Sequence, residues 1–451
     1  MRLTLVGKVM GDIVLINFGY LAAFFIRFAG RIPEYNLEAY FAMAPWITLA
    51  ALILFYSYGL YSPGRRRWEE ISSAIIPATT LMFLIAITLS YLLTQFAFPR
   101  LVFLIAFPVQ LFLMILWRRF AWWWSLKRMG PLRILVVGSV LSASERSEQL
   151  RKSHQFLYQV AGMLVDVPVP FEGNMDNEVP MRGPFAEMAD VIDTMSINGV
   201  LLCHDVPLET RIALVSQAVS RGLSVFVIPE IFELILSNSR LEQLDGIPVF
   251  KLSNASEKSK FALGRLVDFA LSLVLLIPSV PLMLFVALAL KIETPDSPVV
   301  FKQERVGLEG KTFTLFKLRT MVCDAEKLTG PVLALQDDPR VTRLGRILRA
   351  TRIDELPQLF NVLNGDMSFI GPRPERPFFV EQFRKSVPGY DYRHQIKAGI
   401  TGFAQIEGKY STSVEDKLRY DLFYAKIKSP IKDLQILLHT IKVMLMRDKS
   451  M

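Results

Sequence analysis

The stretch IDELPQLFNVLNGDMSFIGPRP, residues 353–374, sets two adjacent carboxylates, Asp354 and Glu355, at the start of a short apolar helix. Apolar residues follow them at helical spacing, at Leu356, Leu359, Phe360 and Leu363. Asp354 is a residue type that caps helix starts, Pro357 suits a first helical turn, and Gly365 is typical of a helix C-cap. Helix formation alone would account for both acids, so the case for catalysis depends on the rest of the chain.

The composition indicates a membrane protein. The chain has 451 residues, of which 52% are hydrophobic, and a formal net charge of +9. Without the aromatic and basic patterns of RNA or DNA modules, an apolar and basic chain favours membrane contact over nucleic-acid binding. Cys203 and Cys323 lie far apart, so neither a disulfide framework nor a cysteine zinc site is predicted. The N-terminal apolar run has no small-residue cleavage site and is predicted to be a retained anchor.

Four apolar stretches approach the roughly 20 residues that a helix needs to cross a bilayer. They lie at residues 9–28, 41–61, 73–93 and 101–117. Basic residues concentrate in alternate loops, at Arg2, Lys8, Arg65–Arg67, Arg118, Arg119, Lys127 and Arg128. The positive-inside rule therefore predicts a four-helix transmembrane bundle over residues 1–130, with both ends in the cytoplasm. Asp12 lies inside the first stretch and either faces the bundle or lies near the membrane surface, and we favour the surface.

Residues 131–250 are predicted to form a Rossmann-like cytoplasmic α/β domain. Buried-strand patterns occur at residues 133–139, 199–205 and 223–229, with helical stretches between them. This alternation favours a mostly parallel sheet. A dinucleotide site would need G-x-G-x-x-G after the first strand, whereas GSVLSASE supplies only Gly138. We therefore expect the fold without its phosphate-binding loop.

A fifth apolar run occupies residues 269–290. Basic residues flank it on both sides, with Arg265 before it and Lys291 after it, so both ends favour the cytoplasm and a straight span cannot satisfy both. Pro278 and Pro281 lie near its midpoint and are expected to break the helix. The sequence predicts a helix-break-helix from Arg265 to Lys291 that enters one leaflet and returns. The alternative is a kinked fifth span, which would place the rest of the chain outside the cell.

Three long motifs together resemble the bacterial sugar transferases, the monotopic polyprenyl-phosphate hexose-1-phosphate transferases. They are RLVDFALSL at residues 265–273, PVVFKQERVGLEGKTFTLFKLRTM at 298–321 and TRIDELPQLFNVLNGDMSFIGPRPERP at 351–377. The upstream layout of four spans and a Rossmann-like domain is similar to the long form of that family. The resemblance implies that residues 251–451 are a catalytic domain, in which a re-entrant membrane helix carries a small cytoplasmic α/β unit.

The resemblance also implies an activity. Members of the family transfer a sugar 1-phosphate from a UDP-sugar, here a UDP-hexose, to undecaprenyl (polyprenyl) phosphate, releasing UMP and using Mg²⁺. This is the first membrane step of exopolysaccharide, capsule or O-antigen synthesis in the bacterial inner membrane. The family's catalytic acids fall on Asp354, as covalent nucleophile, and on Glu355, which assists, and both are candidate metal ligands. Partners are then the UDP-sugar, the lipid phosphate and the bilayer, without nucleic acid, while the sugar and a homodimer are left open.

A site that brings two anionic phosphate substrates together needs cations. Mg²⁺ takes hard oxygen ligands, often one or two carboxylates plus phosphate oxygens, which adjacent Asp and Glu can offer. Arg373, between two prolines, presents a guanidinium suited to phosphate. Arg319 and Lys317 are further candidates for phosphate binding. Arg265 and Lys291 are predicted at the membrane interface, near the lipid phosphate.

Two other classes of protein could share parts of this sequence pattern. A membrane nucleotide-sugar dehydratase or epimerase can share the front half of such a chain, but it would need the glycine-rich NAD loop that is missing, and the Tyr424-x-x-x-Lys428 spacing is too common to replace that signal. A non-enzymatic scaffold for polysaccharide assembly would keep its function when the acids are mutated. We therefore favour the transferase.

The last predicted helix covers residues 429–446, with Ser429 as N-cap and Pro430 at the first helical position. Its apolar residues form one stripe, at Ile431, Leu434, Leu438, Ile441 and Leu445. Such a stripe suits either a membrane surface or the protein core, and both alternatives are open.

Overall fold

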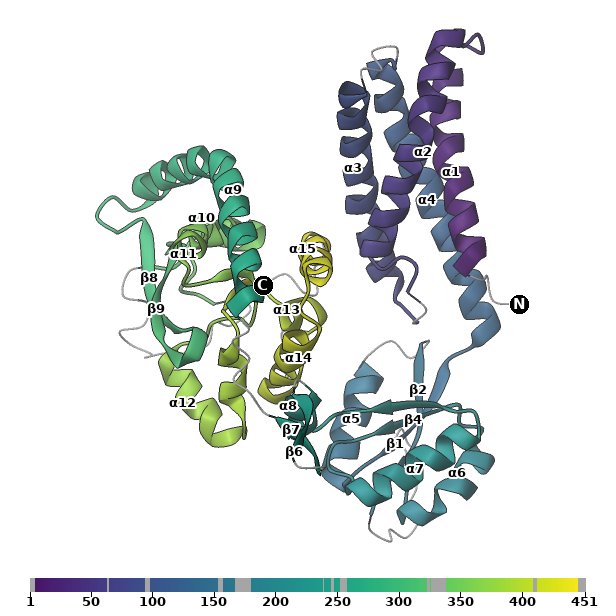
Figure 1. Cartoon of the computed structure of the whole chain (residues 1–451), viewed down its shortest axis with the longest axis vertical. Coiled ribbons are helices and arrows are strands. Elements are labelled where there is room, and N and C mark those ends of the chain that lie inside the picture. Colours follow the sequence, from purple (N-terminus) through teal and green to yellow (C-terminus); the bar gives the residue numbers. More distant parts are fainter. Residues whose placement is uncertain are drawn as a thin grey trace. The chain divides into compact units, whose positions relative to one another are not determined.

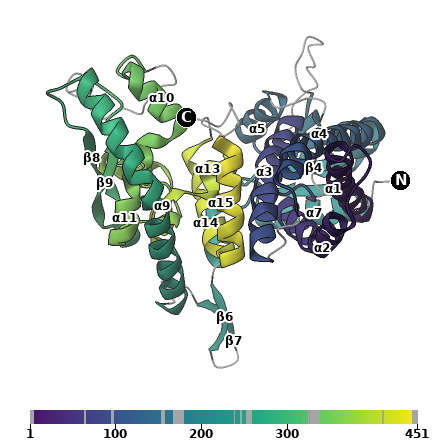
Figure 2. The same ribbon diagram turned by 90° about the horizontal axis from the view of Figure 1, so that it is seen from above.

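A computed structural model of the chain describes residues 5–62, 65–93, 98–152, 157–166, 180–237, 239–244, 247–251, 258–322, 325, 338–408 and 412–444. The chain divides into two units, Met1–Glu230 and Ile231–Met451, which we describe separately (Figures 1 and 2). The first unit holds the N-terminal helices and a parallel sheet. The second holds the acidic pair Asp354 and Glu355.

Four long helices pack side by side in the first unit (Figure 1). They are α1 (Leu5–Arg27), α2 (Glu34–Ser57), α3 (Trp68–Leu92) and α4 (Arg100–Met129). Each is long and apolar enough to cross a membrane, as is a fifth helix in the second unit. The four helices match the four predicted stretches.

Asp12 faces the interior of the helical bundle. It is fully buried, pairs with Arg118 of α4 and accepts a hydrogen bond from the Tyr61 hydroxyl at 2.7 Å. Asp12 therefore faces the bundle, because a charge inside an apolar helix can be buried when another helix supplies its partner. That partner lies 106 residues away and gives no local sequence signal. The position of Asp12 near the membrane surface stays a prediction.

The parallel sheet has five strands in the order β3-β2-β1-β4-β5. The strands are β1 (Leu132–Val137), β2 (Tyr158–Leu164), β3 (Met181–Arg182), β4 (Gly199–Leu202) and β5 (Ser224–Val227). The helices of this domain are α5 (Val140–Lys152), α6 (Met188–Met195) and α7 (Leu208–Ser220). Strand order reverses direction at β1, as in Rossmann-like folds, so the predicted α/β sheet is confirmed.

The second unit begins with α8 (Ile231–Ser237) and the hairpin of β6 (Arg240–Leu244) and β7 (Ile247–Lys251). Leu234 and Ile235 of α8 pack with Tyr390 and Leu418 in one apolar cluster. The chain therefore divides earlier than the predicted boundary at residue 250.

The rest of the second unit surrounds the acidic motif. Its strands are β8 (Val300–Val306), β9 (Thr312–Leu318), β10 (Ser368–Ile370) and β11 (Gly399–Thr401). Its helices are α9 (Lys258–Glu293), α10 (Arg343–Thr351), α11 (Gln358–Asn364), α12 (Pro377–Ser386), α13 (Phe403–Glu407), α14 (Val414–Ile427) and α15 (Pro430–Met444). β8 and β9 form an antiparallel hairpin, and β10 and β11 pair in parallel. Apolar residues of β9, α11, β10 and β11 share one core.

Helix α9 is continuous over 36 residues and contains both Pro278 and Pro281. The predicted interruption between two separate helices is therefore wrong. A proline removes only its own N–H from the helical ladder, and a bend can accommodate its ring. Figure 1 shows α9 changing direction part-way along its length.

Both ends of α9 contact other elements of the second unit. Near the start, the Asp268 carboxylate accepts a hydrogen bond from the Phe369 amide at 3.2 Å. Near the end, Leu290 packs against Leu318 and Leu348. Asp268 and Leu290 would lie about 33 Å apart in a straight helix, and both contact the same unit.

Candidate active site

The two acids lie in a one-turn junction between α10 and α11. Arg352 ends α10 in a left-handed conformation, with φ 59°, and Ile353–Glu355 form a single 3₁₀ turn. Helix α11 starts only at Gln358, with no side-chain cap, so the predicted N-cap role of Asp354 is wrong. The predicted C-cap is confirmed, since Gly365 has φ 93° and donates to carbonyls of the last turn. The junction therefore leaves both carboxylates available for other contacts.

Glu355 is held between cations. Lys317 Nζ donates to Glu355 Oε1 at 2.9 Å, and Arg373 Nη2 donates to the same oxygen at 3.3 Å. Arg352 Nη1 lies 3.8 Å from Glu355 Oε2. Burial alone would raise the pKa of Glu355, but the three positive charges outweigh it and hold this pKa well below its usual range. Glu355 is therefore a stable carboxylate that orients two predicted phosphate-binding side chains.

Asp354 lies in a different environment from its neighbour. Its side chain is buried, and its Oδ1 atom has no hydrogen-bond partner within the described residues. Burial raises the pKa of the Asp354 carboxyl above its usual value, with Lys317 opposing this shift and Glu355 adding to it. An unpaired buried carboxylate oxygen is costly unless a ligand completes it. Asp354 is thus the group best placed to react or to bind a cation.

The residues fit a magnesium ion that is shared with a substrate. In the part of the chain that the structure describes, no group of three or more His, Cys, Asp or Glu side chains could form a complete metal site. Mg²⁺ often takes only one or two carboxylates and completes its coordination with phosphate oxygens and water. The unpaired Asp354 oxygen and adjacent Glu355 supply that ligand type.

Asn361 ties the acidic junction to β9, and the sequence analysis missed it. Its side chain is fully buried, and its Nδ2 donates to Thr314 O at 2.7 Å while its Oδ1 accepts from Phe316 N at 3.1 Å. The amide thus bonds to the β9 backbone much as a neighbouring strand would. It fixes α11 beside the strand that carries Lys317. The available signal was a polar residue between the apolar Phe360 and Val362 in the middle of the helix.

The turn that carries Arg373 is held along its whole length. Four consecutive carbonyls, from Pro372 to Glu375, accept hydrogen bonds from Gly399 N, Arg393 Nη2, Arg305 Nη1 and Val306 N at 3.0, 3.0, 2.9 and 2.9 Å. A Cβ atom at Gly371 would lie 2.0 Å from Lys397 O, so the backbone packs directly on backbone there. Arg373 therefore projects from a fixed support toward Glu355.

A buried ion pair lies behind this turn. Arg393 Nη2 is 2.8 Å from Asp421 Oδ2, with side-chain exposures of 7% and 2%. Burial raises the pKa of Asp421 to about 6, although Arg393 opposes the shift. Because Arg393 also donates to the Arg373 carbonyl, the pair acts on the site through the position of Arg373. Neither residue was singled out from the sequence.

Three other predicted residues serve helix ends or loops. Arg319 Nη2 donates to Leu290 O at 3.1 Å and to Thr294 Oγ1 at 2.5 Å, at the end of α9. Arg265 donates to the last carbonyls of α11, and Lys291 Nζ donates to Pro295 O at 2.7 Å. Among the described residues, no hydrogen bond or ion pair joins any of the three to the acids. Their predicted phosphate contacts remain predictions.

A carboxylate from the β4–α7 loop contacts the β1–α5 turn, where Rossmann-like domains bind phosphate. Asp205 Oδ2 accepts from the Ser139 amide at 3.2 Å. Burial would raise the pKa of Asp205, but hydrogen bonds from Ser139 and Ser142 hold it below its usual value. A Cβ atom at Gly138 would lie 2.7 Å from Cys203 Cβ, so the glycine serves packing. An anionic side chain at this position argues against a bound phosphate.

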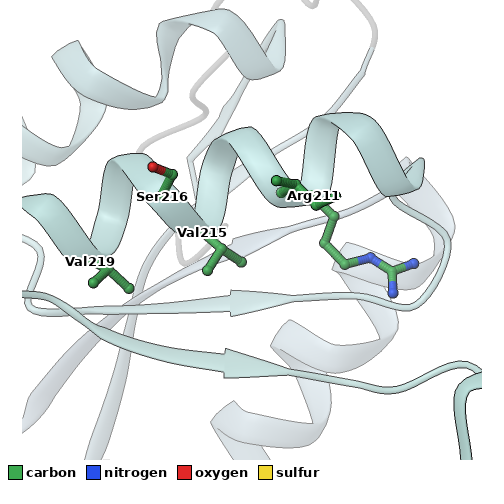
Figure 3. Close-up of a pocket in the computed structure, with 5 residues that line it drawn as sticks. Arg211, Val215, Ser216 and Val219 are labelled. Atoms are coloured by element: carbon green, nitrogen blue, oxygen red, sulfur yellow. The ribbon is translucent and has the colours of Figure 1, made fainter. Parts of the chain in front are cut away.

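A shallow hollow of about 390 Å³ on α7 offers no chemistry for the reaction (Figure 3). Arg211, Val215, Ser216 and Val219 line it. The Arg211 guanidinium is already bonded to the carbonyls of His204 and Val206 and to Glu230. The hollow is therefore mainly an apolar helix surface.

Tyr424 does not support the dehydratase or epimerase alternative. It is 1% exposed, and its hydroxyl donates to Asp433 Oδ1 at 2.8 Å. A catalytic tyrosine would need access to a substrate, whereas this hydroxyl joins α14 to α15 in the interior.

Comparison with known proteins gives consistent findings. A family model described as bacterial sugar transferase matches residues 259–447, and one described as a CoA-binding domain matches residues 57–229. A UDP-glucose:undecaprenyl-phosphate glucose-1-phosphate transferase of Klebsiella pneumoniae is 30% identical over 446 residues, covering 95% of this chain and 93% of that protein. The enzyme of the same name from Escherichia coli (strain K12) is 33% identical over 316 residues, 68% of this chain and 66% of its own length. A UDP-N-acetylgalactosamine-undecaprenyl-phosphate N-acetylgalactosaminephosphotransferase of Aeromonas hydrophila is 45% identical over 168 residues, 37% of this chain and 39% of its own.

The similarity therefore extends over nearly the whole length of one relative. The second description mentions coenzyme A, but at the β1–α5 turn the Ser139 amide already donates to the Asp205 carboxylate, whose negative charge would repel a phosphate there. The resemblance seen in the three sequence motifs is confirmed. The chain belongs to the bacterial sugar transferase family.

Proposed function

We propose that this chain transfers a hexose 1-phosphate from a UDP-sugar to undecaprenyl phosphate, giving undecaprenyl-diphosphate-sugar and UMP. The observation that carries the proposal is the pair of adjacent acids with opposite environments. Asp354 has an unpaired oxygen, while Glu355 holds Lys317 and Arg373 beside it. The names of the relatives support the reaction, and because those names include both glucose and N-acetylgalactosamine enzymes, they do not identify the sugar.

In the proposed first step, an Asp354 oxygen attacks the phosphorus that carries the sugar. The bond between this phosphorus and the bridging oxygen of UMP breaks, and UMP leaves with the electron pair. An acyl-phosphate between Asp354 and the sugar phosphate remains, as in other covalent carboxylate mechanisms. In the second step, an oxygen of the lipid phosphate attacks the same phosphorus, and the Asp354 carboxylate leaves.

Lys317 and Arg373 would bind the phosphate oxygens during both steps. Each now donates to Glu355 Oε1, which sets the two cations on the same side of the acidic junction. Fixed cations in a site that excludes water stabilise the charge that develops on phosphate oxygens. A Mg²⁺ ion held by Asp354 and Glu355 would neutralise phosphate charge there.

We propose further that α9 enters one leaflet and returns, which keeps the catalytic unit in the cytoplasm of a bacterial inner membrane. Support comes from the contacts of both helix ends with other elements of the second unit and from the exposed apolar middle. Ile277, Leu284 and Phe285 are 75%, 66% and 71% exposed. Helix α15 begins at Pro430 with Ser429 accepting from the Lys432 amide, as expected. Its exposed Ile431 and Leu434 suit the same membrane surface.

Mass spectrometry of the lipid product tests the activity. Membranes with undecaprenyl phosphate and Mg²⁺ would be incubated with a panel of UDP-hexoses, and one sugar should give a lipid diphosphate-sugar with release of UMP. The Asp354→Asn variant is the matched control. No product from any UDP-sugar with a folded wild-type protein would favour the scaffold alternative. An equal yield with the variant would show that the observed turnover does not use Asp354.

Cysteine labelling tests the re-entrant helix independently. In a background without Cys203 and Cys323, a single cysteine at Gly264 or at Ile292 should react only with reagents on the cytoplasmic side. Labelling of the Ile292 position from outside would establish a true fifth span.

A further inference from the structure

The end of the helical bundle that bears the basic loops contains a pocket unrelated to the acidic site. Its cavity volume is about 110 Å³, several times the ~10–15 Å³ that holds one water. Basic side chains from three parts of the chain line it, Lys8 on α1, Arg65 and Arg66 in the loop before α3, and Arg118 on α4. Trp122 and Ser62 complete this set, which we name the basic pocket.

Positive charge in the basic pocket is poorly compensated. No acidic residue lines it among the described residues. The nearest acid is Asp12, which already pairs with Arg118 and accepts a hydrogen bond from Tyr61. Lys8 and Arg66 donate no side-chain hydrogen bond within the described residues. Four cations with one counter-charge attract an anion to this cavity.

Arg118 gives a second, independent indication of a ligand. The residue is 4% exposed, and two of its nitrogens bond to Asp12 and to the Leu60 carbonyl. Its third nitrogen, Nε, is buried without a hydrogen-bond partner in the part of the chain that is described. A buried unpaired donor is costly, so a ligand acceptor in the cavity would stabilise it.

The surroundings place the pocket at the level of lipid head groups. The Arg119 guanidinium stacks 5.0 Å from the Trp68 ring centre and 4.7 Å from that of Trp122. Arg128 stacks 4.5 Å from the ring of Trp124 on the same helix. Aromatic rings beside arginines are typical of the membrane–water interface, and basic pockets between transmembrane helices on the cytoplasmic side bind anionic head groups.

We propose that the basic pocket binds the phosphate of a membrane lipid between α1, the α2–α3 loop and α4. The phosphate oxygens would accept from Lys8, Arg66 and Arg118, while the acyl or prenyl chain stays in the bilayer. A phosphodiester of an anionic phospholipid and a polyprenyl monophosphate share this chemistry. The proposal does not depend on the transferase reaction, since every residue belongs to the first unit.

Native mass spectrometry of the delipidated full-length protein tests the proposal. Phosphatidylglycerol, undecaprenyl phosphate, inorganic phosphate and diacylglycerol would be added separately. One molecule of phosphatidylglycerol should bind per chain, or one molecule of undecaprenyl phosphate beyond the one that occupies the acidic site. The lipid that binds more tightly to the basic pocket, as the part of the binding that Arg66→Ala removes, identifies the source. Diacylglycerol, which has no phosphate, should not bind. Binding of inorganic phosphate with no gain from either lipid would overturn the lipid assignment.

Variants separate a specific pocket from general surface charge. Arg66→Ala and Lys8→Gln, on different elements, should each weaken lipid binding about tenfold through loss of a charge-assisted hydrogen bond. Arg67→Ala is the matched control, because Arg67 carries the same charge one residue along but pairs with Glu70 at 2.9 Å. It should change binding less than twofold. Equal losses in all three variants, or unchanged binding in both pocket variants at wild-type melting temperature, would contradict the proposal.

Discussion

Asp205, in the loop between β4 and α7, and Asp354, in the turn between α10 and α11, are two carboxylates with different surroundings. Asp205 accepts a hydrogen bond from the Ser139 amide of the β1–α5 turn. Asp354 is buried with an unpaired oxygen next to a second acid and several cations. The difference teaches that a charge satisfied by its own backbone supports the fold, whereas one left unsatisfied marks a place for a substrate.

The largest expected effect is on the unsatisfied acid. Asp354→Asn should lower the rate of UMP release on the order of 10³-fold or more, because an amide is a poor nucleophile. The melting temperature should not fall, since the variant breaks no contact of the unpaired oxygen. Activity within about tenfold of wild type would remove Asp354 from the role of nucleophile.

A buried support of the site should give the next largest effect. Asp421→Ala leaves Arg393 unpaired in the interior, which costs about 3–5 kcal/mol of unfolding free energy for a buried ion pair. The milder Asp421→Asn should fold and raise KM for the UDP-sugar, because Arg373 loses its fixed support. In a double-mutant cycle with Arg373→Ala, the two losses should be less than additive. Fully additive losses would show that Asp421 does not act through Arg373.

Lys317 should set the pH at which the site becomes active. Its charge lowers the pKa of Asp354, opposing the rise caused by burial, and the nucleophile must be ionised. Lys317→Met should therefore move the acidic limb of the pH–rate profile to higher pH. Lys311→Met is the matched control on the same hairpin, since Lys311 pairs with Glu309 at 2.8 Å and is exposed. A shift to lower pH, or the same shift in both variants, would contradict this role.

The smallest effect is expected at the satisfied acid. Asp205→Asn weakens the bond to the Ser139 amide and should lower the stability of the α/β domain by about 1 kcal/mol, as for other lost caps. Transferase activity should stay within about twofold of wild type. Isothermal titration with coenzyme A should give no binding in either protein. Coenzyme A binding to wild type would show that the turn rearranges around a phosphate.

The sequence predicted the features that depend on local pattern. Long motifs located Asp354, Glu355 and Arg373, apolar length located the helices, and short apolar runs typical of buried strands located the parallel strands. Pro278 and Pro281 were expected to break the helix, but α9 stays continuous through both. Local signals of this kind arise within a few residues and can be read without the fold.

The features that were missed depend on partners far along the chain. The pairs Asp12–Arg118 and Arg393–Asp421 join different helices, and either member alone resembles an ordinary charge. Arg265 was predicted to lie at the membrane interface. The local sequence does not reveal its partners, because the carbonyls at the end of α11 that it binds are nearly 100 residues away. Tertiary contacts of this kind decide whether a charge is structural or available to a substrate.

Trapping of the covalent intermediate tests the central claim most directly. The protein would be incubated with UDP-sugar labelled in the phosphate next to the sugar, with Mg²⁺ and without lipid, and then digested for mass spectrometry. The two-step mechanism predicts label on the peptide that contains Asp354, about one UMP released per active site, and loss of the label when undecaprenyl phosphate is added. A direct transfer predicts no label and no UMP before the lipid is present, and that result would leave Asp354 as a metal ligand or a base.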